Sequence, residues 1–314
     1  MTGKRLARTA IGVVVVAVVA YFFWKSLSKN WASLTESGLS LGWWAAIAVV
    51  LFVIAVAISG WLWGRIVAEL QGAPLASSEA IRVHYASWLL KYVPGQAGFV
   101  LNKVAWGKSR GISRLLVLLS VVYENAFLLL GSTVPMLAIL LLAQVGRSAS
   151  GPSSTVWFAI AAVIPLAAVT HPALFRRAVN ALGRRVLKRD VPAEYFLPTR
   201  AALGYQLAFL APRVVNGVAI AIIAAALADA PADSWVPLGA AYAIAGAVGI
   251  LAVFVPSGLG VRESVFVLFA TPYLSVEQAI IVALAARVLT TIADAGIAGI
   301  YGVMTLAKRN KEKP

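Results

Sequence analysis

The stretch Val255–Glu263 constrains the fold most, because it interrupts an apolar run that is otherwise long enough to cross a lipid bilayer. Its sequence, Val-Pro-Ser-Gly-Leu-Gly-Val-Arg-Glu, combines helix-breaking residues with two adjacent charges. A break at membrane depth exposes backbone groups that lipid cannot satisfy, so it must be buried in protein or line a wet cavity. A similar break lies in Lys91–Gly98. Two broken apolar segments, one in each half of a chain, indicate the binding site of a transporter.

Composition supports a chain buried in lipid. Hydrophobic residues make up 61% of the 314 residues, and charged residues only 12%. We therefore expect an all-α polytopic membrane protein in which residues 1–314 form a single integral membrane domain. The net charge of +15 arises from basic residues that lie between apolar runs. We expect these residues to set the orientation of the membrane spans and to contact anionic headgroups, rather than to bind nucleic acid. The absence of cysteine from the sequence excludes disulfides, Cys-ligated zinc and thiol nucleophiles.

The apolar runs predict about six to eight membrane-crossing helices and two broken re-entrant hairpins. The first hairpin is predicted at residues 78–107, where each arm beside the break at Pro94 is too short to cross the membrane. The second is predicted at residues 235–271, although its first arm, 235–254, is long enough to span and a full crossing stays open. If the hairpins enter from opposite faces, the basic tail 308–313 remains cytoplasmic, and the two halves form an inverted repeat.

Basic clusters set the predicted orientation. Residues 173–198 contain six arginines and lysines, which predicts a cytoplasmic loop (Arg176, Arg177, Arg184, Arg185, Lys188 and Arg189). Further spans are predicted at residues 9–24 and 155–170. We expect a multi-pass protein of the cell (plasma) membrane with both termini in the cytoplasm.

Ionisable residues inside the apolar runs point to a substrate site, because each costs at least roughly 2.5–3.5 kcal/mol in hydrocarbon unless it faces a cavity or a partner. We expect the basic side chains to converge on an anionic phosphate, and Glu124 and Glu263 to balance their charge or carry a proton. The alternative is purely structural: Arg287 and Asp294 lie seven residues apart on one helix face and neutralise each other. The candidate substrate-binding residues are Lys91, Pro94, Gly95, Glu124, Arg213, Pro256, Gly258, Gly260, Arg262, Glu263, Arg287 and Asp294.

Three stretches, Trp88–Gly95, Ser120–Glu124 and Val255–Glu263, together with Arg287, resemble the membrane region of bacterial lysylphosphatidylglycerol synthetases and of the stand-alone flippase-like proteins that share it. The resemblance implies a translocator of phospholipids or lipid-linked sugars. It departs at Asn125, where the family often has arginine. Lysine-transferring members carry a soluble aminoacyltransferase domain after the membrane region, and since this sequence ends at Pro314 we expect no lysine transfer.

The function predicted from these features is transbilayer translocation of an anionic lipid, either a phospholipid or a polyprenyl-phosphate-linked sugar. We expect a transporter rather than an enzyme, with no cofactor, because Gly258-Leu259-Gly260 lacks the Lys-Ser/Thr of a phosphate-binding loop and follows no predicted strand. One alternative is an integral-membrane transferase acting on a lipid-linked sugar, with Glu124 or Glu263 as general base. Another is a non-catalytic partner of a membrane lipid synthase, such as a lipid-synthesising glycosyltransferase.

Overall fold

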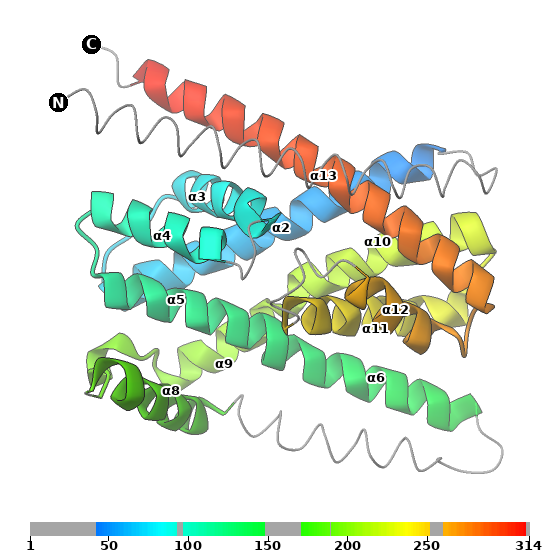
Figure 1. Cartoon of the computed structure of the whole chain (residues 1–314), viewed down its shortest axis with the longest axis horizontal. Helices are drawn as coiled ribbons and strands as arrows, with labels where there is room; N and C mark the ends of the chain where they lie inside the picture. Colours follow the sequence, from blue (N-terminus) through cyan, green and yellow to red (C-terminus); the bar gives the residue numbers. More distant parts are fainter. Residues whose placement is uncertain (1–41, 93–96, 148–170, 189, 252–259, 312–314) are drawn as a thin grey trace.

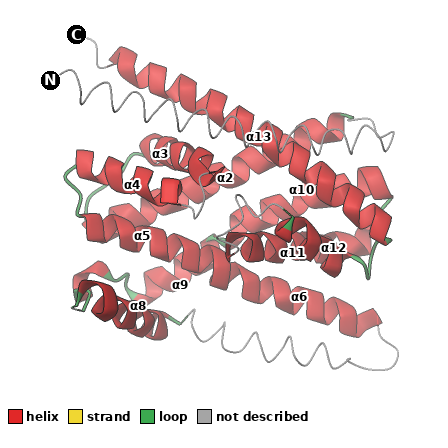
Figure 2. Ribbon diagram, in the orientation of Figure 1, coloured by secondary structure: helices red, strands yellow, loops and turns green. Residues whose placement is uncertain are grey.

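The computed structural model describes residues 42–92, 97–147, 171–188, 190–251 and 260–311. In these ranges the chain forms helices joined by turns and loops, without a strand (Figure 2), which confirms the predicted all-α fold. The predicted spans 9–24 and 155–170 lie outside the described residues. So do four of the predicted site residues, namely Pro94, Gly95, Pro256 and Gly258.

The described helices follow one another in the order shown in Figure 1: α2 (Trp43–Gln71), α3 (Ser77–Leu89), the 3-10 turn η1 (Leu90–Tyr92), α4 (Ala97–Ser109), α5 (Arg114–Ala126), the π-helical turn η3 (Phe127–Gly131), α6 (Ser132–Arg147), α8 (Pro172–Leu187), the 3-10 turn η4 (Ala193–Tyr195), α9 (Thr199–Ala208), α10 (Leu210–Ala228), α11 (Ala232–Leu251), α12 (Val261–Ala270) and α13 (Val276–Lys311). Five stretches of the described chain are long and apolar enough to cross a membrane: 43–71, 114–143, 193–228, 232–251 and 276–308. The protein is therefore a multi-pass membrane protein.

Two helical hairpins lie at opposite ends of the molecule. The first consists of α3 and α4, which pack on each other and against α2 and α5. The second consists of α11 and α12, and α11 packs against α6 and α10. Figure 1 shows the first hairpin beside α5 and the second beside α6, the two halves of one long helical stretch. The long helix α13 contacts both hairpins, through α3 and through α12.

The second hairpin begins and ends at the same end of the molecule. Near the start of α13, the Gln278 side chain donates a hydrogen bond of 3.1 Å to the carbonyl of Ala228, at the end of α10. Although α11 alone is long enough to span a membrane, α12 thus returns the chain to the end where α11 began. This arrangement agrees with a hairpin entered from one face, whereas the inverted repeat stays a prediction.

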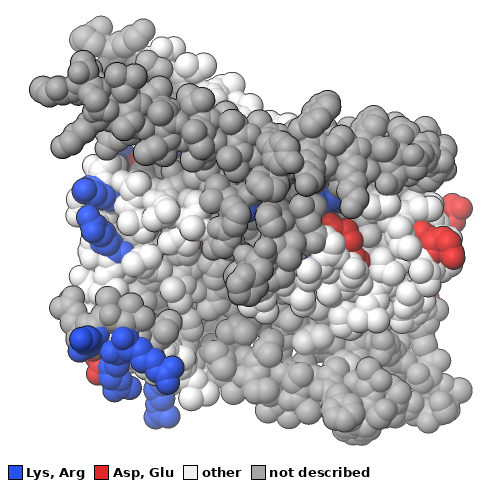
Figure 3. All heavy atoms as spheres, viewed as in Figure 1, with Lys and Arg blue, Asp and Glu red and all other residues white. Residues whose placement is uncertain are grey.

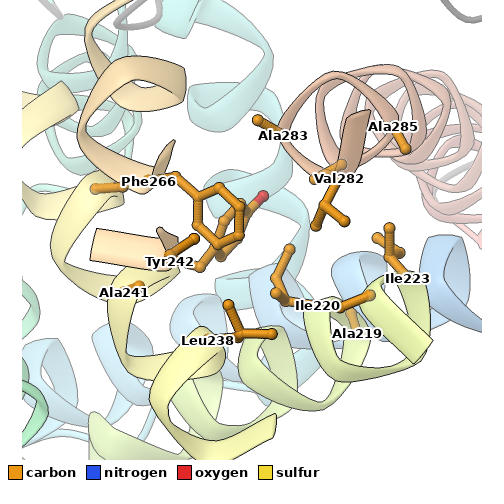
Figure 4. Packing of buried hydrophobic residues seen from close by; sticks show 14 of the residues in the cluster. Ala219, Ile220, Ile223, Leu238, Ala241, Tyr242, Phe266, Val282, Ala283 and Ala285 are labelled. Carbon is orange, nitrogen blue, oxygen red and sulfur yellow. The ribbon is translucent and has the colours of Figure 1, made fainter. Parts of the chain in front are cut away.

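Small residues allow the helices around the second hairpin to pack closely. A Cβ atom at Gly239 of α11 would lie 2.9 Å from the Cα of Gly217 in α10, so the two backbones cross almost in contact. Figure 4 shows the core that surrounds this crossing, with Ile220 of α10, Leu238 of α11 and Val282 of α13 facing one another. Within lipid, helices associate by such packing rather than by exclusion of water, and small residues therefore line their interfaces.

The basic segment 173–198, predicted as a loop, is largely the helix α8. Its arginines fall on exposed positions, while Phe175 is buried with its ring centroid 4.6 Å from that of Tyr123. Arg176 and Arg184 lie eight residues apart, about two helical turns, and share one face of this amphipathic helix. The connection between spans thus contains a helix, and its cytoplasmic placement stays a prediction. In Figure 3, Lys and Arg gather at the end of the molecule that holds α8 and the first hairpin, and Asp and Glu at the opposite end.

The stretch from α5 to α6 contains a π-helical turn at Phe127–Gly131. Pro135 follows Gly131 by four residues and has no N–H to donate to the carbonyl of that residue, which interrupts regular α-helical bonding at this point. A π-helical turn leaves backbone carbonyls without their regular helical donors, and such turns are frequent at functional sites.

Candidate functional site

Four basic side chains from four different elements lie close together where the two hairpins approach each other: Lys91 of η1, Arg213 of α10, Arg262 of α12 and Arg287 of α13. Tyr242 of α11 lies among them, and the Arg262 guanidinium is 4.3 Å above the centre of its ring. Lys91 is within electrostatic reach of both Arg262 and Arg287. The predicted convergence of these four residues is therefore the observed geometry, while their role in binding stays a prediction.

Lys91 is held by the carboxylate of Asp294 on α13. Its Nζ lies 2.7 Å from Asp294 Oδ2 and 2.9 Å from Oδ1. The Trp88 indole N–H donates to the same Oδ1 at 2.8 Å, and Lys91 Nζ lies 4.2 Å from the centre of the Trp88 ring. Two groups of the first hairpin thus share one acceptor on α13.

Arg287 contacts the second hairpin. Its Nη1 lies 3.8 Å from Oε1 of Glu263, the residue that follows Arg262 on α12. Asp294 therefore pairs with the first hairpin, and Arg287 contacts the second.

Gly260 and Glu263 build the first turn of α12. Gly260 has φ of +82°, in the left-handed region that favours glycine. Its backbone N–H donates to Glu263 Oε2 at 2.7 Å, so this carboxylate caps the helix with one oxygen and approaches Arg287 with the other. The break thus ends in a turn that fixes the carboxylate of Glu263.

Arg213 is buried and reaches the π-helical turn. Its Nη2 donates to the carbonyl of Leu128 at 2.9 Å. Gly246 of α11 provides the necessary room, since a Cβ there would lie 3.2 Å from Arg213 Nη1. The π-helical turn therefore supplies a backbone acceptor for this buried guanidinium.

A small pocket opens beside these residues. Its lining consists of Tyr242, Arg262, Glu263, Phe266, Ala283 and Arg287. Its volume is about 10 Å³, close to the roughly 10–15 Å³ that a single water molecule needs.

The basic cluster also holds acidic side chains. Among the described residues, its four basic side chains lie with two carboxylates, those of Glu263 and Asp294, so basic groups outnumber acidic ones.

Glu124 does not join this cluster. It lies on α5, where its Oε2 is 2.5 Å from Lys103 Nζ and its Oε1 is 3.2 Å from His84 Nδ1.

Two members of the site, Tyr242 and Trp88, were not predicted from the sequence. Trp88 could have been predicted, because it belongs to a stretch that resembles the family. Tyr242 could not, because it is a single aromatic residue in an apolar run.

Comparison with known proteins adds a family to this geometry. A family model described as the lysylphosphatidylglycerol synthase TM region matches residues 9–298, which include every site residue discussed above. No curated protein matches the chain.

Proposed function

Because the chain belongs to the family of the lysylphosphatidylglycerol synthase TM region, we propose that it moves an anionic lipid between the two leaflets of a bilayer. The substrate is a phospholipid or a polyprenyl-phosphate-linked sugar. The observation that carries this proposal is the basic cluster of Lys91, Arg213, Arg262 and Arg287, which come from four elements and meet between the hairpins.

Arginine suits a phosphate ligand because its planar guanidinium donates to two oxygens at once. Arg262 and Arg287 line the pocket and make the direct contacts, while Lys91 and Arg213 lie behind them and add positive potential. A phosphate that leaves water loses its hydration, and these donors replace it. The apolar tails stay in the membrane, against exposed apolar side chains such as Leu251 and Leu268 on the second hairpin.

Translocation then follows from competition for the basic residues. A phosphate bound to Arg287 competes with Glu263, which weakens the contact between α12 and α13. On the other side of the cluster, the contacts of Asp294 with Trp88 and Lys91 hold the first hairpin. Alternate release of the two hairpins gives the headgroup access to one leaflet at a time. We place the end with α8 and the first hairpin in the cytoplasm, because basic residues gather there.

Lipid transfer in liposomes tests the proposal. The purified protein is reconstituted, and the movement of fluorescent phosphatidylglycerol and of a polyprenyl-phosphate probe between leaflets is measured. We expect Arg262→Ala to slow transfer strongly, and Arg184→Ala, which removes the same charge from an exposed position on α8, to leave it unchanged. Transfer by Arg262→Ala at the wild-type rate would refute the site. Incubation of the same preparation with a radiolabelled lipid-linked sugar tests the transferase alternative.

A further inference from the structure

A second buried polar cluster lies inside the first hairpin. It joins His84 of α3, Lys103 of α4 and Glu124 of α5, whose side chains are 1%, 0% and 1% exposed. The Glu124 carboxylate stands between the two bases, 3.2 Å from His84 Nδ1 and 2.5 Å from Lys103 Nζ. We call these three residues the triad. Since each member comes from a different helix, any movement of the hairpin against α5 must change the distances between them.

The surroundings of the triad are apolar and tight. The Lys103 ammonium lies 4.2 Å from the centre of the Trp63 ring and 4.1 Å from that of Phe99. On α2, which packs over the triad, a Cβ at Gly60 would approach the Cβ of His84 to 2.8 Å. Within the described chain, the charges that act on the three groups come from the triad itself.

A purely structural role accounts for only part of this arrangement. The Lys103–Glu124 ion pair is electrically neutral and needs no third member. His84 adds a titratable ring whose two nitrogens are buried and form no hydrogen bond with the described residues, and Glu124 Oε1 beside it also forms none. A buried nitrogen without a partner destabilises a fold, and histidine is the side chain that most readily gains or loses a proton near neutral pH.

We propose that the triad is a proton-binding site, and that the opening of the first hairpin away from α5 is linked to the uptake of one proton. The proton comes from the aqueous phase at the first-hairpin end and binds His84 Nε2, which converts the imidazole to imidazolium. Glu124 then stands between two cations, and the triad changes from neutral to a net charge of +1. A dry, closed hairpin disfavours this excess charge, whereas water that enters on opening stabilises it. Protonation and opening therefore favour each other, as reciprocal linkage requires.

The triad is connected to the basic cluster through Trp88. This residue lies one helical turn after His84 on α3, and the two rings are stacked with centroids 6.3 Å apart. The Trp88 indole donates to Asp294, the carboxylate that holds Lys91. A shift of His84 therefore acts on the acceptor that fixes the tip of the hairpin. This inference rests on the proposed function only where it links the proton to lipid movement.

Histidine NMR gives a direct test, because the sequence contains two histidines. The second, His171, is exposed at the start of α8 and serves as an internal reference. The full chain, labelled with ¹⁵N in histidine, is placed in phosphatidylcholine nanodiscs with or without phosphatidic acid and titrated from about pH 4 to about pH 8. Burial and the neighbouring charge of Lys103 hold the pKa of His84 well below that of an ordinary histidine. We expect its midpoint to lie on the acid side of the range and to move when phosphatidic acid is added or when Glu124 is replaced in Glu124→Gln.

Transport supplies the second measurement. A single titrating site changes from about 90% to about 10% protonated over about two pH units, so the rate of fluorescent lipid transfer by the wild type should change by up to about tenfold across that interval. In His84→Gln the rate should be flat with pH. If this variant does not fold, the wild-type titration alone decides.

The outcomes separate the two proposals. If the His84 signal does not change across the pH range, the proton site is refuted even if lipid is transferred. It is also refuted if the His84 midpoint is the same with and without phosphatidic acid and in Glu124→Gln. Conversely, a His84 midpoint that responds as expected, in a protein that transfers none of the lipid probes, supports the proton site and refutes the proposed translocation.

Discussion

The ion pair between Lys91 and Asp294 allows an energetic prediction, because the Asp294 side chain is buried and the Lys91 side chain is partly exposed. The exposed fractions of the two side chains are 19% and 5%. Removal of one partner from a fully buried pair costs roughly 3–5 kcal/mol, and exposed pairs contribute roughly 0–1 kcal/mol. We expect Asp294→Asn, which leaves Lys91 without a carboxylate, to destabilise the protein by about 2–3 kcal/mol, an intermediate value.

A double-mutant cycle isolates the pair from the other contacts of its members. The change Lys91→Met keeps the length of the side chain and removes its charge, so the double variant removes both charges of the pair together. We expect the double variant to be more stable than Asp294→Asn alone, with a coupling energy of about 1.5–3 kcal/mol. The free energy of unfolding is measured by denaturant titration of the purified protein in one fixed detergent.

The matched control is the exposed pair Arg184–Asp190, formed by α8 and the residues that follow it. Its atoms lie 3.5 Å apart, but its side chains are 62% and 57% exposed, so its coupling energy should stay below about 0.5 kcal/mol. Equal coupling energies for the two pairs, or strictly additive effects of Lys91→Met and Asp294→Asn, would show that Asp294 does not hold the first hairpin.

Three further predictions concern backbone and surface. Gly239→Ala should lower the melting temperature, because its Cβ would lie 2.9 Å from the facing α10 backbone, whereas Gly204→Ala, with no atom within 4 Å, should not. Gly260→Ala should destabilise the protein by roughly 1–2 kcal/mol in denaturant titration, because its φ of +82° strains any residue with a Cβ. Burial raises the pKa of Glu79, but hydrogen bonds from Arg110 and a neighbouring indole outweigh it and hold this pKa below its usual value. Since the folded-state pKa is depressed, Glu79 stabilises the fold above the unfolded pKa of about 4.3, and this contribution is lost as the pH falls through the folded value. Thermal unfolding at a series of pH values should therefore show Glu79→Gln less stable than the wild type at neutral pH and similar to it in acid.

The sequence indicated the basic cluster because charge in an apolar run is rare and costly. Lys91, Arg213, Arg262 and Arg287 each stood out for this reason, and the requirement for a shared cavity predicted that they meet. The pairing of partners was not predictable. Whether Asp294 faces Arg287 on its own helix or Lys91 on another depends on how helices are rotated and placed, which no local pattern encodes.

Glu124 shows the same limit. Its burial in an apolar run was apparent, but its partners His84 and Lys103 come from the two arms of a hairpin, and the contact exists only once those arms pack on α5. Tyr242 entered the site without any signal, because an aromatic residue in an apolar helix more often faces lipid or core than a guanidinium. The helix α8 was not predicted, because its basic residues were interpreted by their charge and not by their helical spacing.

One rigid helix carries the anchors of both hairpins. On α13, Arg287 and Asp294 lie about two turns apart, one joined to the second hairpin and the other to the first. A tilt or slide of this helix that brings one anchor toward its partner carries the other away from its own. We expect the two ends of the molecule to open in turn and not together, so that a lipid path exists without a continuous leak for water and ions across the membrane.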